Sequence, residues 1–91
     1  MIKDDESDII SGLCNGSKKA FEKIFFRYHQ LIYNFCLRLL SSHDEAEEIV
    51  QNVFVALWEQ RSRLDVSKPV LPYLFSIARY MVYSELRKQV Y

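Results

Sequence analysis

Cationic and aromatic side chains alternate along the last third of the sequence, from Arg61 to Lys88. Cations hold a phosphate backbone and flat rings stack on unpaired bases, each stacked base contributing about 1–3 kcal/mol. The residues of this pattern are Arg61, Arg63, Lys68, Tyr73, Phe75, Arg79, Tyr80, Tyr83, Arg87 and Lys88. The pattern favours a nucleic-acid surface, although a solvated helix face with half-buried tyrosines is also consistent with it.

The segment that ends at Trp58 carries a different candidate surface. Val55 and Trp58 fall away from the stripe that a helix here would bury, and tryptophan is a frequent hot-spot residue of protein interfaces. The polar side chains Glu48, Gln51 and Asn52 lie close by on the same helix. This combination indicates a protein-docking face, and the alternative is that Trp58 folds back into the core.

Other chemistry lacks support in the sequence. His29 and His43 have no metal-ligand spacing to each other or to Cys14 and Cys36. Two glycines are too few for a phosphate-binding loop, and neighbouring glutamates such as Glu47 and Glu48 point in different directions on a helix. We therefore predict no catalytic site, no metal site and no cofactor. The two cysteines, without an export signal, read as reduced cytoplasmic thiols that fill the core.

Charge is segregated along the chain although it sums to zero, with 12 basic and 12 acidic residues. Residues 41–60 hold five acidic side chains and no basic one, whereas residues 61–91 hold six basic and two acidic ones. Residues 18–40 are basic and residues 1–17 are acidic. Such blocks allow one face to meet an anion and another face to meet a basic partner, or they neutralise each other within the fold.

Helical spacing of apolar residues runs through nearly the whole chain and must position these side chains. Asn15-Gly16 would end the first helix, and Ser17 and Ser42 are suited to cap the second and third. The expected elements are a short helix from about Glu6 to Cys14, a long amphipathic helix of roughly 24 residues after Ser17, a third helix over residues 44–60, a loop over 61–69 and a fourth helix with Pro72 in its first turn.

Length and composition define the class. Ninety-one residues, 49% of them hydrophobic and 14% aromatic, describe one small globular domain with a core. Two Gly and two Pro are too few for the turns of an all-β fold. Without a long apolar run or an N-terminal apolar segment, we expect neither membrane insertion nor export. The prediction is an all-α, compact helical domain of three main helices plus a short N-terminal one.

Three ordered motifs resemble conserved region 2 of the extracytoplasmic-function (ECF) sigma factors of bacterial RNA polymerase, a branch of the sigma-70 family. They are Asp44-Glu-Ala-Glu-Glu-Ile-Val-Gln-Asn-Val-Phe-Val-Ala-Leu-Trp58, Tyr73-Leu-Phe-Ser-Ile-Ala-Arg-Tyr80 and Glu85-Leu-Arg-Lys88. Upstream, Ala20 through Leu40 is similar to the long helix that opens that region. The resemblance covers roughly residues 8–90.

The resemblance implies two binding roles and no enzymatic one. The helix over 44–60 would dock on the β′ clamp helices of core RNA polymerase, and an anti-sigma factor is a further expected partner. The docking residues would be Glu48, Gln51, Asn52, Val55, Leu57 and Trp58. The loop and last helix would bind the non-template strand of the melted −10 promoter element and hold a flipped-out base near Tyr73. The DNA-binding residues would be Arg61, Arg63, Lys68, Tyr73, Arg79, Tyr80, Tyr83, Ser84, Arg87 and Lys88.

The chain departs from the family pattern at three of these positions. The family usually has an acidic residue where Asn52 stands, Asn where Tyr80 stands and Asp where Ser84 stands, so promoter preference does not carry over. A complete member also has a C-terminal helix-turn-helix domain for the −35 element. We therefore expect residues 1–91 to correspond to the region 2 domain, with that second domain absent from this chain.

Two rival functions remain open from the sequence. One is a helical protein-interaction module that regulates transcription without direct DNA contact. The other is an ordinary helix-turn-helix binder of duplex DNA, which the connection of about 10 residues before the last helix disfavours, because such motifs use a turn of 3–4 residues.

Overall fold

The computed structural model describes residues 6–90 and shows an all-α fold with no strand in that range. Asp4 and Asp5, which belong to the acidic block of residues 1–17, lie outside the described residues. The elements are α1 (Glu6–Cys14), α2 (Lys18–Leu40), α3 (His43–Glu59), the 3-10 turn η1 (Arg61–Arg63) and α4 (Leu71–Val90). Three main helices plus a short N-terminal one are thus confirmed.

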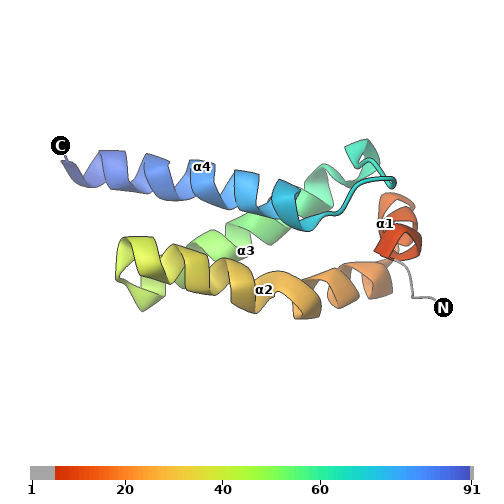
Figure 1. The fold of residues 1–91 in the computed structure, drawn as a ribbon, viewed down its shortest axis with the longest axis horizontal. Helices are drawn as coiled ribbons and strands as arrows, with labels where there is room; N and C mark the ends of the chain where they lie inside the picture. The colour runs from red at the N-terminus through yellow and green to blue at the C-terminus, as the bar shows by residue number, and fades with distance from the viewer. Residues whose placement is uncertain (1–5, 91) are drawn as a thin grey trace.

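The three long helices pack along one another in an elongated bundle of 48 × 23 × 20 Å. Figure 1 shows that α2 and α4 run in the same direction and that α3 runs in the opposite direction. The short helix α1 lies at the end of the bundle where α2 begins and where the connection from α3 turns into α4 (Figure 1). This arrangement brings α1 beside the segment between η1 and α4.

Local capping explains where α2 and α3 begin. The Ser17 hydroxyl accepts the backbone N–H of Ala20 at 3.0 Å, and the Ser42 hydroxyl accepts that of Glu45 at 3.2 Å, as predicted. Gly16 supplies the left-handed turn after α1 with φ 88°. The end of α2 was not predicted in this form, since Ser41 itself adopts a left-handed conformation, with φ 56°, and donates its N–H to the Leu37 carbonyl.

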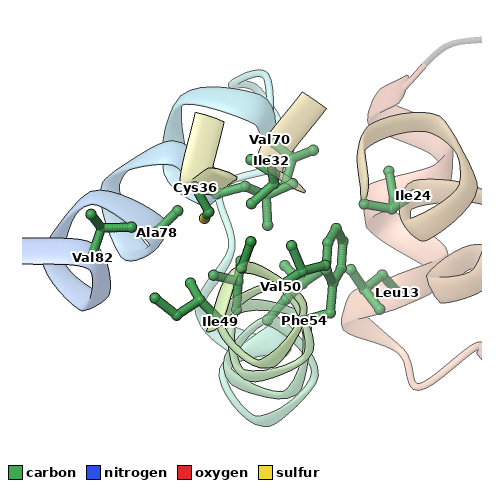
Figure 2. Close-up of a cluster of buried hydrophobic side chains, with 14 of the residues drawn as sticks. Leu13, Ile24, Ile32, Cys36, Ile49, Val50, Phe54, Val70, Ala78 and Val82 are labelled. Atoms are coloured by element: carbon green, nitrogen blue, oxygen red, sulfur yellow. The ribbon is translucent and has the colours of Figure 1, made fainter. Parts of the chain in front are cut away.

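The core is built from one stripe of each helix, and no polar or charged side chain within residues 6–90 is classed as buried. Figure 2 shows Ile49, Val50 and Phe54 of α3 facing Ile32 and Cys36 of α2. Cys36 is fully buried and Cys14 is half-buried, and both thiols are free. Cysteine here fills apolar space, as predicted.

One detail of the last third differs from the prediction. Arg61–Arg63 forms a 3-10 turn and not a loop, because the N–H of Arg63 donates to the carbonyl of Gln60 and extends α3 by a tighter turn. Pro72 lies in the first turn of α4, as predicted. None of the helices between residues 6 and 90 has the length and hydropathy that crossing a membrane requires.

Candidate nucleic-acid interface

A hollow of about 370 Å³ lies between α1, η1 and the start of α4. Its wall is mainly apolar and includes Ile10, Leu64, Val70 and Tyr73. Three exposed charged residues also line it, the cations Arg63 and Lys68 and the carboxylate of Asp65. An apolar concavity whose charged lining has a cationic excess fits a flat, uncharged ring attached to an anionic backbone.

Tyr73 is held in this hollow by a hydrogen bond that sequence reasoning missed. Its hydroxyl donates to Oε1 of Gln60, at 2.9 Å, the residue that caps the C-terminus of α3. Burial raises the pKa of Tyr73, against a smaller opposing effect of the Arg63 charge. The ring is therefore neutral at physiological pH and half-buried, with its orientation fixed by the end of α3.

Arg61 lies away from this hollow and against α3. Its guanidinium carbon sits 4.1 Å from the centroid of the Trp58 ring, and its Nη1 donates to the Trp58 carbonyl at 2.7 Å. Trp58 in turn packs edge-on against Phe21 of α2, with ring centroids 5.5 Å apart. Trp58 is thus half-buried at the edge of the core. This position is intermediate between an exposed docking residue and a core residue, the two alternatives that the sequence left open.

The remaining predicted DNA-binding residues lie on α4. Tyr80 and Tyr83 are 70% and 46% exposed, and Arg79, Arg87 and Lys88 are exposed as well. Ser84 is half-buried and accepts a hydrogen bond from the Arg87 guanidinium at 3.3 Å. These side chains are accessible to a ligand along two and a half turns of helix.

A second hollow, of about 280 Å³, separates α4 from α3. It brings together Tyr80, Ser84 and Lys88 of the predicted DNA set with Glu48 and Asn52 of the predicted docking set. Among the described residues it shares no lining residue with the hollow at Tyr73. The predicted DNA residues are therefore not gathered in one hollow.

The predicted docking residues of α3 divide by burial. Glu48, Gln51, Asn52 and Val55 are exposed on one side of the helix, with Val55 52% exposed. Leu57 is different, because its side chain is fully buried in the core. The assignment of Leu57 to the docking surface is corrected on this point: in this fold it supports α3 from within and presents no surface to a partner.

A third hollow, of about 460 Å³, lies between α2 and α3 and was not predicted. His29 stacks on Phe25 at 4.5 Å, with Nδ1 2.9 Å from the Phe25 carbonyl. His43 pairs with the Tyr33 hydroxyl instead. Within residues 6–90, no three His, Cys, Asp or Glu side chains are gathered as a metal site would require.

Comparison with known proteins gives a consistent family. The model of the sigma-70 region 2 family matches residues 24–90. The ECF RNA polymerase sigma factor SigW of Bacillus subtilis is 30% identical over 74 residues, which cover 81% of this chain and 40% of the relative. SigL of Mycobacterium tuberculosis is 24% identical over 79 residues, covering 86% and 45%, and CarQ of Myxococcus xanthus is 28% identical over 75 residues, covering 82% and 43%.

A solved structure shares the fold. It is an NMR structure of an engineered region 2 of sigmaE in complex with GTAAAA, with a TM-score of 0.83 and 20% identity, covering 97% of this chain and 94% of the other. The chain spans between 40% and 45% of the length of the curated relatives named above. Since the family model covers most of residues 6–90 and the fold agrees, the chain belongs to the sigma-70 region 2 family.

Proposed function

We propose that this chain is the part of an ECF-type sigma factor that docks on core RNA polymerase and binds the −10 promoter element. Its relatives are named as ECF sigma factors, and the structural neighbour is a region 2 in complex with GTAAAA. The catalysis of transcription would reside in the polymerase, and this chain would supply binding. A partner in RNA polymerase implies that the protein acts in the cytoplasm.

The observation that carries the DNA-binding half is the mainly apolar hollow at Tyr73, whose lining holds two cations against the single carboxylate of Asp65. Arg63 and Lys68 stand at its rim, and Tyr73 offers a ring whose hydroxyl is already bonded to Gln60. A base flipped out of the melted strand would enter this hollow, with its phosphates near the two cations. Residues of α4, all of them exposed except the half-buried Ser84, would hold the rest of the strand, namely Arg79, Tyr80, Tyr83, Ser84, Arg87 and Lys88.

The docking half is supported by the exposed polar and acidic side chains of α3, although Glu48 and Asn52 also border the second hollow that α3 shares with α4. Glu48 stands with Gln51, Asn52 and Val55 on the exposed side of α3, and acidic residues would repel a nucleic acid. A basic helical partner such as the β′ clamp helices would suit this face. Trp58 would complete its edge, held in place by Arg61.

The DNA half is tested by fluorescence anisotropy with a labelled single strand that contains GTAAAA, against the same sequence as a duplex. We expect binding of the single strand, and a loss of about 10-fold with Tyr73→Ala because one stacked base is worth about 1–3 kcal/mol. Arg63→Gln should lower the salt dependence of binding by about one phosphate, while the matched change Lys23→Gln on α2 should leave it unchanged. Preference for duplex would favour the helix-turn-helix alternative.

The docking half is tested by capture of a β′ clamp-helix fragment. Trp58→Ala combined with Gln51→Ala should abolish capture, and the exposed change Lys23→Ala should not. Capture without any single-strand binding would instead support the protein-interaction module as the function.

A further inference from the structure

The carboxylate of Glu6 connects α1 with α2 and with the loop that precedes α4. Oε2 of Glu6, the first residue of α1, accepts the backbone N–H of Val70 at 2.8 Å. Its Oε1 accepts the Tyr28 hydroxyl and lies 3.5 Å from Nη1 of Arg27, both on α2. The Glu6 side chain is only 21% exposed, so these interactions are partly shielded from water.

The position of Val70 makes this contact significant. Val70 immediately precedes α4, is 2% exposed, and its carbonyl accepts the N–H of Leu74 to begin the helix. Val70 also lines the hollow that holds Tyr73. The carboxylate of Glu6 therefore fixes the junction between the loop and α4, where a negative charge is also favoured by the helix dipole.

Other residues of α1 also contact the loop and the hollow. Ile10 is 1% exposed and forms part of the floor of the hollow, and the Cys14 thiol approaches the Leu64 carbonyl at 4.0 Å. The loop orders its own tip, because Asp65 accepts both the N–H and the hydroxyl of Ser67. Both ends of the loop are thus in contact with α1, and the end at Val70 is held by the charged group of Glu6.

We propose that Glu6 is a positioning residue for nucleic-acid binding, which sets the loop of residues 64–70 so that Lys68 and Tyr73 line one ligand-ready hollow. Glu6 acts through the Val70 N–H and touches no ligand itself. It lies outside residues 24–90, the span that the family model matches. The inference rests on the proposed function, because it assigns Glu6 to the site where the single strand would bind.

The direction in which single-strand affinity changes when Glu6 is replaced distinguishes a positioning role from a purely electrostatic one. Removing a negative charge close to a DNA site should strengthen binding if only charge matters. Loss of the positioned loop should weaken it. We expect Glu6→Ala to weaken single-strand binding by about 5–10-fold, the equivalent of one charge-assisted hydrogen bond. The matched change Asp8→Ala removes an exposed carboxylate two residues further along the first turn, and it should leave affinity unchanged or slightly tighter.

Conservative variants keep the test sharp. Glu6→Gln retains an amide oxygen for the Val70 N–H and should recover most of the affinity, whereas Tyr28→Phe removes one donor to the carboxylate with little change in packing. In a double variant with Tyr73→Ala, Glu6→Ala should add less than its separate effect, because both changes act on one hollow. Hydrogen exchange at the Val70 amide gives a readout independent of DNA: it should quicken in Glu6→Ala and stay slow in Glu6→Gln.

The outcomes distinguish this inference from the proposed function. Wild-type protein that fails to bind any single strand would overturn the proposed function and with it the binding role of Glu6. Normal wild-type binding, weakened by Tyr73→Ala but not by Glu6→Ala, would overturn the positioning role alone. Unchanged Val70 exchange in folded Glu6→Ala protein would also overturn it, whatever the affinity.

Discussion

The guanidinium of Arg61 covers the ring of Trp58, with the guanidinium carbon 4.1 Å from the ring centroid, and the same group donates to the Trp58 carbonyl. These two residues belong to different proposed surfaces, Arg61 to the DNA-binding set and Trp58 to the docking set. Their contact lies where α3 passes into η1. It ties the edge of the docking face to the first residue of the segment that leads to the hollow at Tyr73.

Arg61→Ala should therefore change stability more than DNA affinity. A partly desolvated cation–π contact contributes about 1 kcal/mol, and we expect a fall of this order in the free energy of unfolding. Single-strand affinity should fall less than with Arg63→Ala, because the Arg61 guanidinium is already occupied while Arg63 lines the hollow. Urea denaturation and anisotropy of the two variants check the prediction. A larger affinity loss for Arg61→Ala would contradict it.

The helices were predictable because their signals are local. Ser17 and Ser42 cap helices through backbone groups three residues away, and the apolar spacing directs each stripe to the core. The family motifs predicted two binding surfaces for the same reason, since their order and spacing are properties of the sequence itself.

The hollow at Tyr73 and the hydrogen bonds that hold its lining residues were not predictable from local sequence signals. Glu6 and Val70 stand 64 residues apart, and Tyr73 and Gln60 meet only because the connection folds back on α3. Leu57 was misassigned because the family motif was followed and the helical spacing was not. Leu57 stands four residues after Val53, on the stripe of α3 that is buried.

Leu57 and Val55, two residues apart on α3, should respond in opposite ways. Leu57→Ala leaves a cavity in the core and should lower the free energy of unfolding by about 2–5 kcal/mol. Val55→Ser alters an exposed position and should change stability by less than about 0.5 kcal/mol, yet weaken capture of the β′ clamp-helix fragment. Denaturation and capture assays on both variants test this. Normal capture by Val55→Ser would remove Val55 from the docking surface.

The turn between α2 and α3 should yield two changes of opposite sign. Ser41 holds a left-handed conformation that costs a side-chain-bearing residue energy, so Ser41→Gly should raise stability by about 0.5–1 kcal/mol. Ser42→Ala removes the cap of α3 and should lower stability by about 1 kcal/mol. Thermal denaturation of both variants, with the exposed change Ser62→Ala as control, measures the difference. A destabilised Ser41→Gly variant would contradict the first expectation.

Cys36 should make the fold sensitive to alkaline pH. Burial raises the pKa of its thiol from 9.0 to about 11, so the folded state holds the proton more tightly than the unfolded state does. The stabilisation is complete below pH 9 and is lost as the pH rises towards 11, with a total of roughly 2–3 kcal/mol. The raised pKa values of Tyr28 and Tyr73 act in the same direction.

Urea denaturation at intervals from pH 8 to pH 11 isolates the contribution of Cys36. Cys36→Ala should be less stable than the wild type at pH 8, because it leaves a small cavity, but should lose less stability between pH 9 and pH 11. Cys14→Ala keeps the buried thiol and should follow the wild-type slope. Parallel pH profiles for Cys36→Ala and the wild type would show that the ionisation of this thiol does not limit the alkaline stability of the fold.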